Sequence, residues 1–139
     1  MSRIIKTSTP GKERARLSKA IIVTIRAFLR QGEPDQNSRD MVAFVILALE
    51  HISSGIDMSV EAWEKRGYWV KADKYRMEWR WSGEYAKKLR KAFSRSAWEE
   101  IANLFIQIMQ KFNAIKVSDQ HRMGQPWKDA FREYSTSTR

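Results

Sequence analysis

The sequence of 139 residues contains no cysteine, only three prolines, and no Asn-Gly or Asp-Gly dipeptide. Without cysteine there are neither disulfides nor thiolate metal sites, so a hydrophobic core alone must stabilise the fold, as is typical of proteins from reducing compartments. Without hairpin dipeptides, and without a sustained alternation of apolar and polar residues, strand signals are weak. We therefore expect an all-α protein.

Targeting segments are also absent. Residues 1–12 include no apolar signal-peptide core, and no window of about 18 uncharged apolar residues follows. The sequence therefore predicts a cytoplasmic protein. We also expect no binding to a membrane surface, because the basic helices present no spare apolar face once the bundle forms.

Motifs for catalysis and cofactor binding are missing as well. There is no phosphate-binding glycine loop and no His-Glu-x-x-His helix, and the two histidines, His51 and His121, are far apart in the chain. A dimetal bundle would need Glu-x-x-His on paired helices, which this chain does not have. We expect no enzyme activity, no cofactor and no metal.

The apolar residues, in contrast, recur at the three- and four-residue spacing of helices. Thr9 and Pro10 are suited to begin the first helix, Asp35 or Ser38 to cap the second, and Gly67 to end it. A Ser-x-x-Glu capping box, Ser96 to Glu99, predicts the start of the fourth helix. The four predicted helices cover residues 10–31, 35–66, 69–93 and 98–115.

The short connections between these helices favour antiparallel neighbours. We therefore predict an antiparallel up-down-up-down four-helix bundle over residues 10–115, preceded by a flexible basic arm, 1–9. The tail, 116–139, has Trp127, Phe131 and Tyr134 on one face of a short helix that should pack on the bundle. Four other tryptophans, Trp63, Trp69, Trp79 and Trp98, are predicted to lie in the core or at helix junctions.

Positive charge dominates: 26 Lys and Arg against 16 Asp and Glu give a net charge of +10. It concentrates on two helical stripes, which predict contacts with a phosphate backbone. Two aromatic residues outside the assigned apolar face could stack on unpaired bases. The candidate nucleic-acid-binding residues are Lys12, Arg16, Lys19, Arg26 and Arg30 on the first helix, and Lys74, Arg76, Arg80, Trp81, Tyr85, Lys87, Lys88 and Lys91 on the third.

Negative charge gathers on one face of the second helix, at Glu50, Asp57, Glu61 and Glu64. We expect these carboxylates to pair with basic stripes, either within the bundle or on a protein partner or second copy.

The leading hypothesis is a non-catalytic nucleic-acid-binding accessory protein, with RNA or single-stranded DNA favoured because aromatics interleave with the basic stripes. The alternative is a homo-oligomeric or hetero-oligomeric assembly subunit that binds through opposite-charge helix faces; a third possibility is that the stripes are simply solvated. In architecture alone, such a bundle resembles the accessory proteins of diversity-generating retroelements and the helical small subunits of CRISPR effector complexes. That resemblance implies contact with nucleic acid, but it carries over no residue roles.

Overall fold

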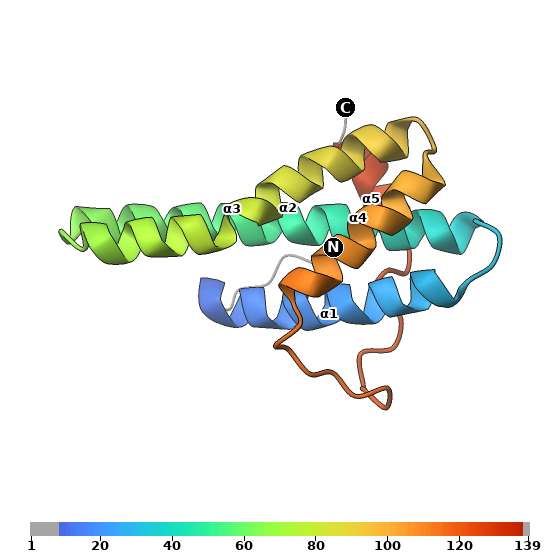
Figure 1. The fold of residues 1–139 in the computed structure, drawn as a ribbon, viewed down its shortest axis with the longest axis horizontal. Coiled ribbons are helices and arrows are strands. Elements are labelled where there is room, and N and C mark those ends of the chain that lie inside the picture. Colours follow the sequence, from blue (N-terminus) through green and yellow to red (C-terminus); the bar gives the residue numbers. More distant parts are fainter. Residues whose placement is uncertain (1–8, 138–139) are drawn as a thin grey trace.

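The computed structural model describes residues 9–137, and every regular element among them is a helix. The helices are α1 (Pro10–Arg30), α2 (Gln36–Lys65), α3 (Trp69–Ser94), α4 (Trp98–Lys111) and α5 (Ala130–Ser137), shown in Figure 1. The predicted all-α class is confirmed. The predicted N-terminal arm lies outside the described residues except for Thr9.

The first two helices begin at the predicted caps. The Thr9 hydroxyl accepts a hydrogen bond from the Lys12 backbone N–H, and Pro10 occupies the first helical position. At α2 the N-cap is Asp35, one of the two predicted candidates, and Ser38 is the third helical residue: Asp35 Oδ1 accepts from Ser38 N (2.9 Å), and Ser38 Oγ accepts from Asp35 N (3.1 Å). Such a reciprocal capping box satisfies two free amides of the helix end.

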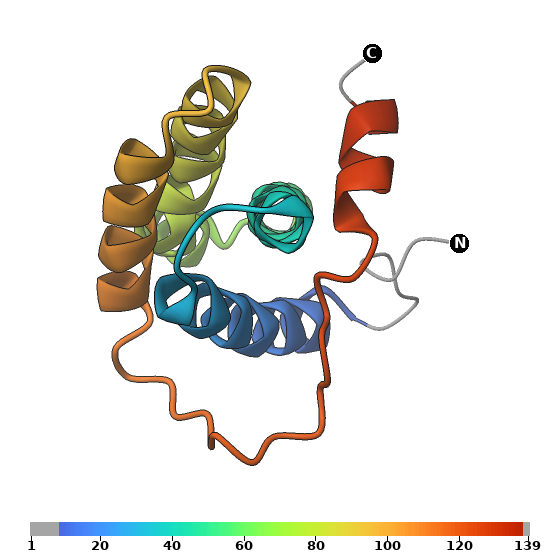
Figure 2. The same cartoon turned by 90° about the vertical axis from the view of Figure 1, so that its right-hand side faces the viewer.

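Helix α2 is the centre of the molecule. It packs against α1, α3 and α5, while α4 packs against α3 and α1 (Figure 2). Its residues from Met41 to Leu49 are almost all buried, as predicted. By length and composition α2 could cross a membrane, but 56% of its most apolar 18-residue window is buried inside the protein, as in a core helix.

The α2–α3 and α3–α4 connections use the same C-terminal capping motif. After α2, Gly67 has a φ of +82°, and the Tyr68 N–H donates to the Trp63 carbonyl (2.9 Å). After α3, Ser96 has a φ of +51°, and the Ala97 N–H donates to the Ala92 carbonyl (2.9 Å). In both, a residue in the left-handed region lets the chain satisfy the last free carbonyls of the helix.

The predicted capping box at α4 is therefore wrong. The residue before α4 is Ala97, and α4 has no side-chain cap hydrogen bond, because Ser96 instead ends α3. Helix α4 also ends at Lys111 and not near Ile115, since the chain turns after Phe112. Only one face of α4 is buried, and Ile106 on the other side is 46% exposed.

Residues 112–129 form a long connection that runs past α1 to α5 (Figure 2). The predicted packing of the tail is confirmed: Trp127 is buried, and its indole N–H donates to Asn37 Oδ1 (2.7 Å). The free Phe131 N–H at the start of α5 donates to Asp40 Oδ1 (2.9 Å). Two side chains near the start of α2 thus hold α5 in place.

Candidate nucleic-acid interface

The outer face of α3 carries a row of exposed cations. Because α3 packs against α2 and α4 through its other side, the side chains on this face point to solvent. None of them forms an ion pair with another residue of the part of the chain that the structure describes. We call these cations the cationic face of α3: Arg80, Lys87 and Lys91 lie on one line of the helix, Lys88 and Lys74 lie beside it, and the exposed Glu84 lies between Lys91 and Lys88.

Two other arginines of α3 are bound to carboxylates of α2. Arg76 Nη2 lies 2.6 Å from Glu64 Oε2 and also pairs with Asp73, and Arg90 donates through two nitrogens to Glu50, one at 2.9 Å. The hydrogen bonds that Arg76 donates to Glu64 and that Arg90 donates to Glu50 raise the pKa of each guanidinium group. Arg76 is therefore not a free phosphate ligand, although it was a predicted one.

The acidic face of α2 is correspondingly occupied in part. Glu50 and Glu64 pair with α3 within the bundle, one of the two arrangements expected from the sequence. Glu61 pairs with Lys65 on its own helix (3.5 Å), and Asp57 is exposed.

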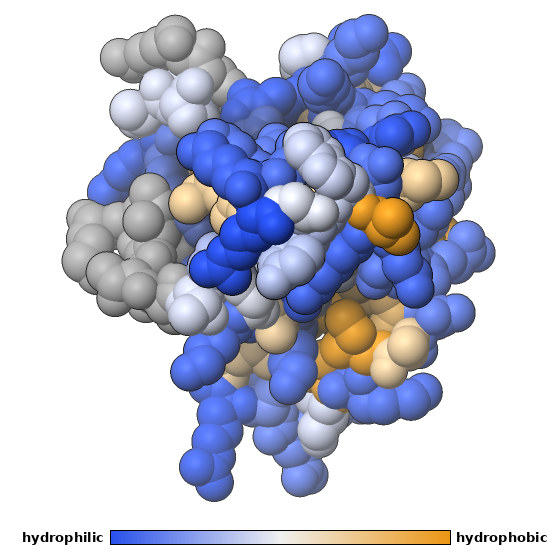
Figure 3. Space-filling view, turned by 90° about the vertical axis from the view of Figure 1, so that its left-hand side faces the viewer, coloured by the Kyte–Doolittle hydropathy of each residue, from blue (hydrophilic) through white to orange (hydrophobic). Residues whose placement is uncertain are grey.

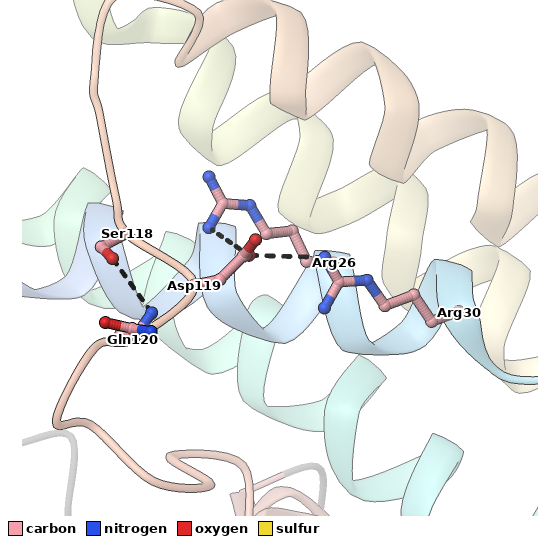
Figure 4. A network of polar contacts seen from close by, with 5 residues as sticks. All are labelled: Arg26, Arg30, Ser118, Asp119 and Gln120. Atoms are coloured by element: carbon pink, nitrogen blue, oxygen red, sulfur yellow. Dashed lines mark hydrogen bonds and ion pairs between the residues drawn. The ribbon is translucent and has the colours of Figure 1, made fainter.

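On α1, the predicted stripe is divided. Arg16 pairs with the buried Glu13, and Arg26 and Arg30 both lie near Asp119 Oδ1, at 3.6 Å and 3.4 Å. Figure 4 shows how the connection to α5 brings Asp119 between these two arginines. Lys12 and Lys19 are the members of the stripe that remain exposed without an ion pair to a described residue.

The structure does not bring the two stripes together. Both α1 and α3 pack against α2, and α4 packs against both α1 and α3. Their outer faces consequently point to different sides of the molecule, α1 below and α3 at the upper left of Figure 2. A single ligand surface therefore includes one stripe, and the face of α3 retains more unpaired cations.

The predicted position of Trp81 and Tyr85 is wrong. Both side chains are partly buried against the core, and the Trp81 ring lies 5.2 Å from the ring of Phe112. The Tyr85 hydroxyl donates to Gln107 Oε1 (2.7 Å), while Lys88 Nζ lies 5.0 Å from the Tyr85 ring centroid. Both rings thus join α3 to α4 and have little free surface for a base.

Aromatic surface is exposed instead at the end of the α2–α3 hairpin, a site the sequence analysis missed. Tyr68, Trp69 and Val70 are 53%, 61% and 84% exposed, and we call them the hairpin tip. They line a shallow pocket of about 470 Å³ with Gly67 and Lys71. The sequence did contain a signal for this site. Three large side chains directly follow Gly67, between the end of α2 and the periodic apolar residues of α3.

A second cavity gathers polar side chains between α1, α2 and α3. Glu13, Arg14, His51 and Tyr75 line it, and the Arg14 guanidinium donates to the Tyr75 hydroxyl. Its volume of about 160 Å³ is below the roughly 300 Å³ at which ligand pockets begin. Within residues 9–137, no three His, Asp or Glu side chains are close enough to hold a metal ion.

Comparisons with known proteins found no matching family model, no similar curated protein and no similar solved structure.

Proposed function

We propose that this chain is a non-catalytic, cytoplasmic nucleic-acid-binding accessory protein, in which α1 to α4 act as one up-down-up-down four-helix bundle. The observation that carries the proposal is the cationic face of α3. Its five Lys and Arg side chains are exposed and unpaired with any described carboxylate, while the neighbouring Arg76 and Arg90 are held by α2. An exposed row of unpaired cations binds phosphates and releases their counterions.

Only part of the predicted site enters this proposal. The contacts with phosphate are assigned to Lys74, Arg80, Lys87, Lys88 and Lys91. Arg16, Arg26, Arg30 and Arg76 are engaged in ion pairs with carboxylates of the chain, and Lys12 and Lys19 lie on another side. RNA or single-stranded DNA is favoured over a duplex, because the α2–α3 hairpin exposes aromatic rings. Such rings can stack on unpaired bases, whereas the bases of a duplex are already stacked on one another.

Direct binding measurements test the proposal. Fluorescently labelled single-stranded RNA, single-stranded DNA and duplex DNA would be titrated with the protein between about 50 and 200 mM salt. We expect micromolar or tighter binding of the single strands at low salt, with an affinity that falls linearly on a logarithmic salt scale. No binding at the lowest salt concentration would overturn the proposal.

The alternative, an assembly subunit that binds partners through opposite-charge helix faces, has less support. Glu50 and Glu64 pair with α3 and Glu61 pairs with Lys65, so Asp57 is the member of the acidic face without an ion pair to a described residue. A salt-sensitive oligomer with no affinity for nucleic acid would favour this alternative.

A further inference from the structure

The hairpin tip places three large exposed side chains next to one another, Tyr68, Trp69 and Val70. Figure 1 shows the α2–α3 hairpin extending beyond α1 and α4, and Figure 3 looks at this end of the molecule, where pale and orange side chains lie among hydrophilic ones. Such a surface costs solubility, and exposed apolar patches on monomeric proteins commonly mark binding sites. The ligand therefore has to be identified from what surrounds the tip.

Unpaired cations surround the tip. Arg66 and Lys74 are exposed without an ion pair to a described residue, and Lys71 Nζ lies 4.5 Å from the Trp63 ring centroid. The only carboxylate between residues 65 and 74 is Asp73, which pairs with Arg76. Aromatic rings surrounded by free positive charge suit a ligand that presents both π-systems and phosphates.

The tip is also continuous with the cationic face of α3. At 100° per residue, Trp69 lies on the same side of the helix as Arg80, Lys87 and Lys91. Between Trp69 and Lys91 the helix advances about 33 Å. A nucleic-acid strand lying along α3 could therefore contact both ends of this surface.

The tip is held by the capping motif that ends α2. The Tyr68 N–H donates to the Trp63 carbonyl, and the Ala72 N–H at the start of α3 donates to the Tyr68 carbonyl (3.0 Å). The backbone on both sides of the two rings is therefore fixed by hydrogen bonds before any ligand binds. An ordered backbone reduces the conformational entropy that this segment loses when its rings stack on a base.

We propose that the hairpin tip is a base-stacking site, where Trp69 and Tyr68 stack on unpaired bases of a single strand whose phosphates follow the cationic face of α3. This inference rests on the proposed function and adds the feature that selects single strands.

The test compares two oligonucleotides of about 12 nucleotides. One is oligo(dT); the other has the same phosphates but abasic sugars in place of the nucleotides. The variant Trp69→Leu keeps apolar bulk and removes the aromatic ring, and Ile106→Ala on α4 is a matched control at another exposed apolar position. Thermal unfolding of both variants checks that the fold is unchanged.

We expect Trp69→Leu to weaken oligo(dT) binding about 5- to 100-fold and to leave binding of the abasic strand unchanged. Ile106→Ala should change neither affinity.

Equal binding of oligo(dT) by Trp69→Leu and the original protein, or an equal loss for both strands, would overturn the stacking site while leaving the proposed function intact. Trp69-dependent binding to phosphatidylserine vesicles without Trp69-dependent oligonucleotide binding would overturn it in favour of a membrane surface. If the original protein bound neither strand, the proposed function would fail as well.

Discussion

At the scale of single residues, Gly67 and Ser96 occupy equivalent positions in two helix C-caps but have different side chains. Gly67 and Ser96 both adopt the left-handed conformation that ends a helix, but only glycine does so without steric cost. We expect Ser96→Gly to raise the free energy of unfolding by about 0.5–1 kcal/mol, because relief of strain exceeds the added entropy of the unfolded chain.

The matched change is Gly67→Ala, which should lower the free energy of unfolding by about 1 kcal/mol or more. Urea unfolding followed by circular dichroism measures both. Equal effects of the two substitutions would contradict the assigned motif.

Tyr134 is the residue whose ionisation should affect stability. Burial raises the pKa of Tyr134 above its usual value of about 10. The unfolded chain therefore loses this proton first as the pH rises, so the free energy of unfolding should fall from about pH 10 upward. Tyr134→Phe keeps the ring and removes the ionisable group.

Unfolding measured between pH 8 and pH 11, a range set by the ordinary pKa of about 10, would show this difference. The original protein should lose stability relative to Tyr134→Phe at the alkaline end. Parallel pH profiles would contradict the assigned shift.

At the scale of helices, the contact between α2 and α3 includes the ion pair of Glu50 with Arg90. Both side chains are partly exposed, and the guanidinium donates two hydrogen bonds to the carboxylate. A double-mutant cycle with Glu50→Gln and Arg90→Gln should give a coupling of about 0.5–1 kcal/mol that decreases with salt. Zero coupling at low salt would instead leave Glu50 free for a partner.

Most helix boundaries were predictable because the local chemistry decides them. The caps of α1 and α2 and the end of α2 at Gly67 follow from residues next to the boundary. The predicted start of α4 was wrong because Ser96 suits two motifs. Its side chain could cap α4, but its backbone takes part in the capping motif that ends α3. Apolar spacing also continued through Ile115 after the helix had ended, since Phe112 remains buried in the turn.

The candidate site was predictable only in part. The basic row on α3 follows from helical spacing, and the pairing of Arg16 with Glu13 is visible in the i, i+3 spacing. The other pairings join residues far apart in the chain, such as Arg26 with Asp119 or Arg76 with Glu64, and depend on how the helices pack. The inward position of Trp81 was missed because the groove between α3 and α4 also accepts residues at the edge of the apolar face.

At the scale of the whole molecule, net charge and charge placement make different predictions. A protein with a net charge of +10 attracts nucleic acid in a general way. Our account assigns binding to one face, so two variants with the same net charge should behave differently. Lys87 and Lys91 lie on the cationic face of α3, and Lys12 and Lys19 are exposed on α1.

The most direct test is the salt dependence of single-stranded RNA binding by Lys87→Glu/Lys91→Glu and Lys12→Glu/Lys19→Glu. Each double substitution lowers the net charge by four, from +10 to +6. We expect the α3 variant to bind more weakly and to reduce the slope of log affinity against log salt by roughly 1.4, at about 0.7 per phosphate contact. The α1 variant should retain nearly the original affinity and slope. Equal losses in both variants, or no loss in the α3 variant, would contradict the account.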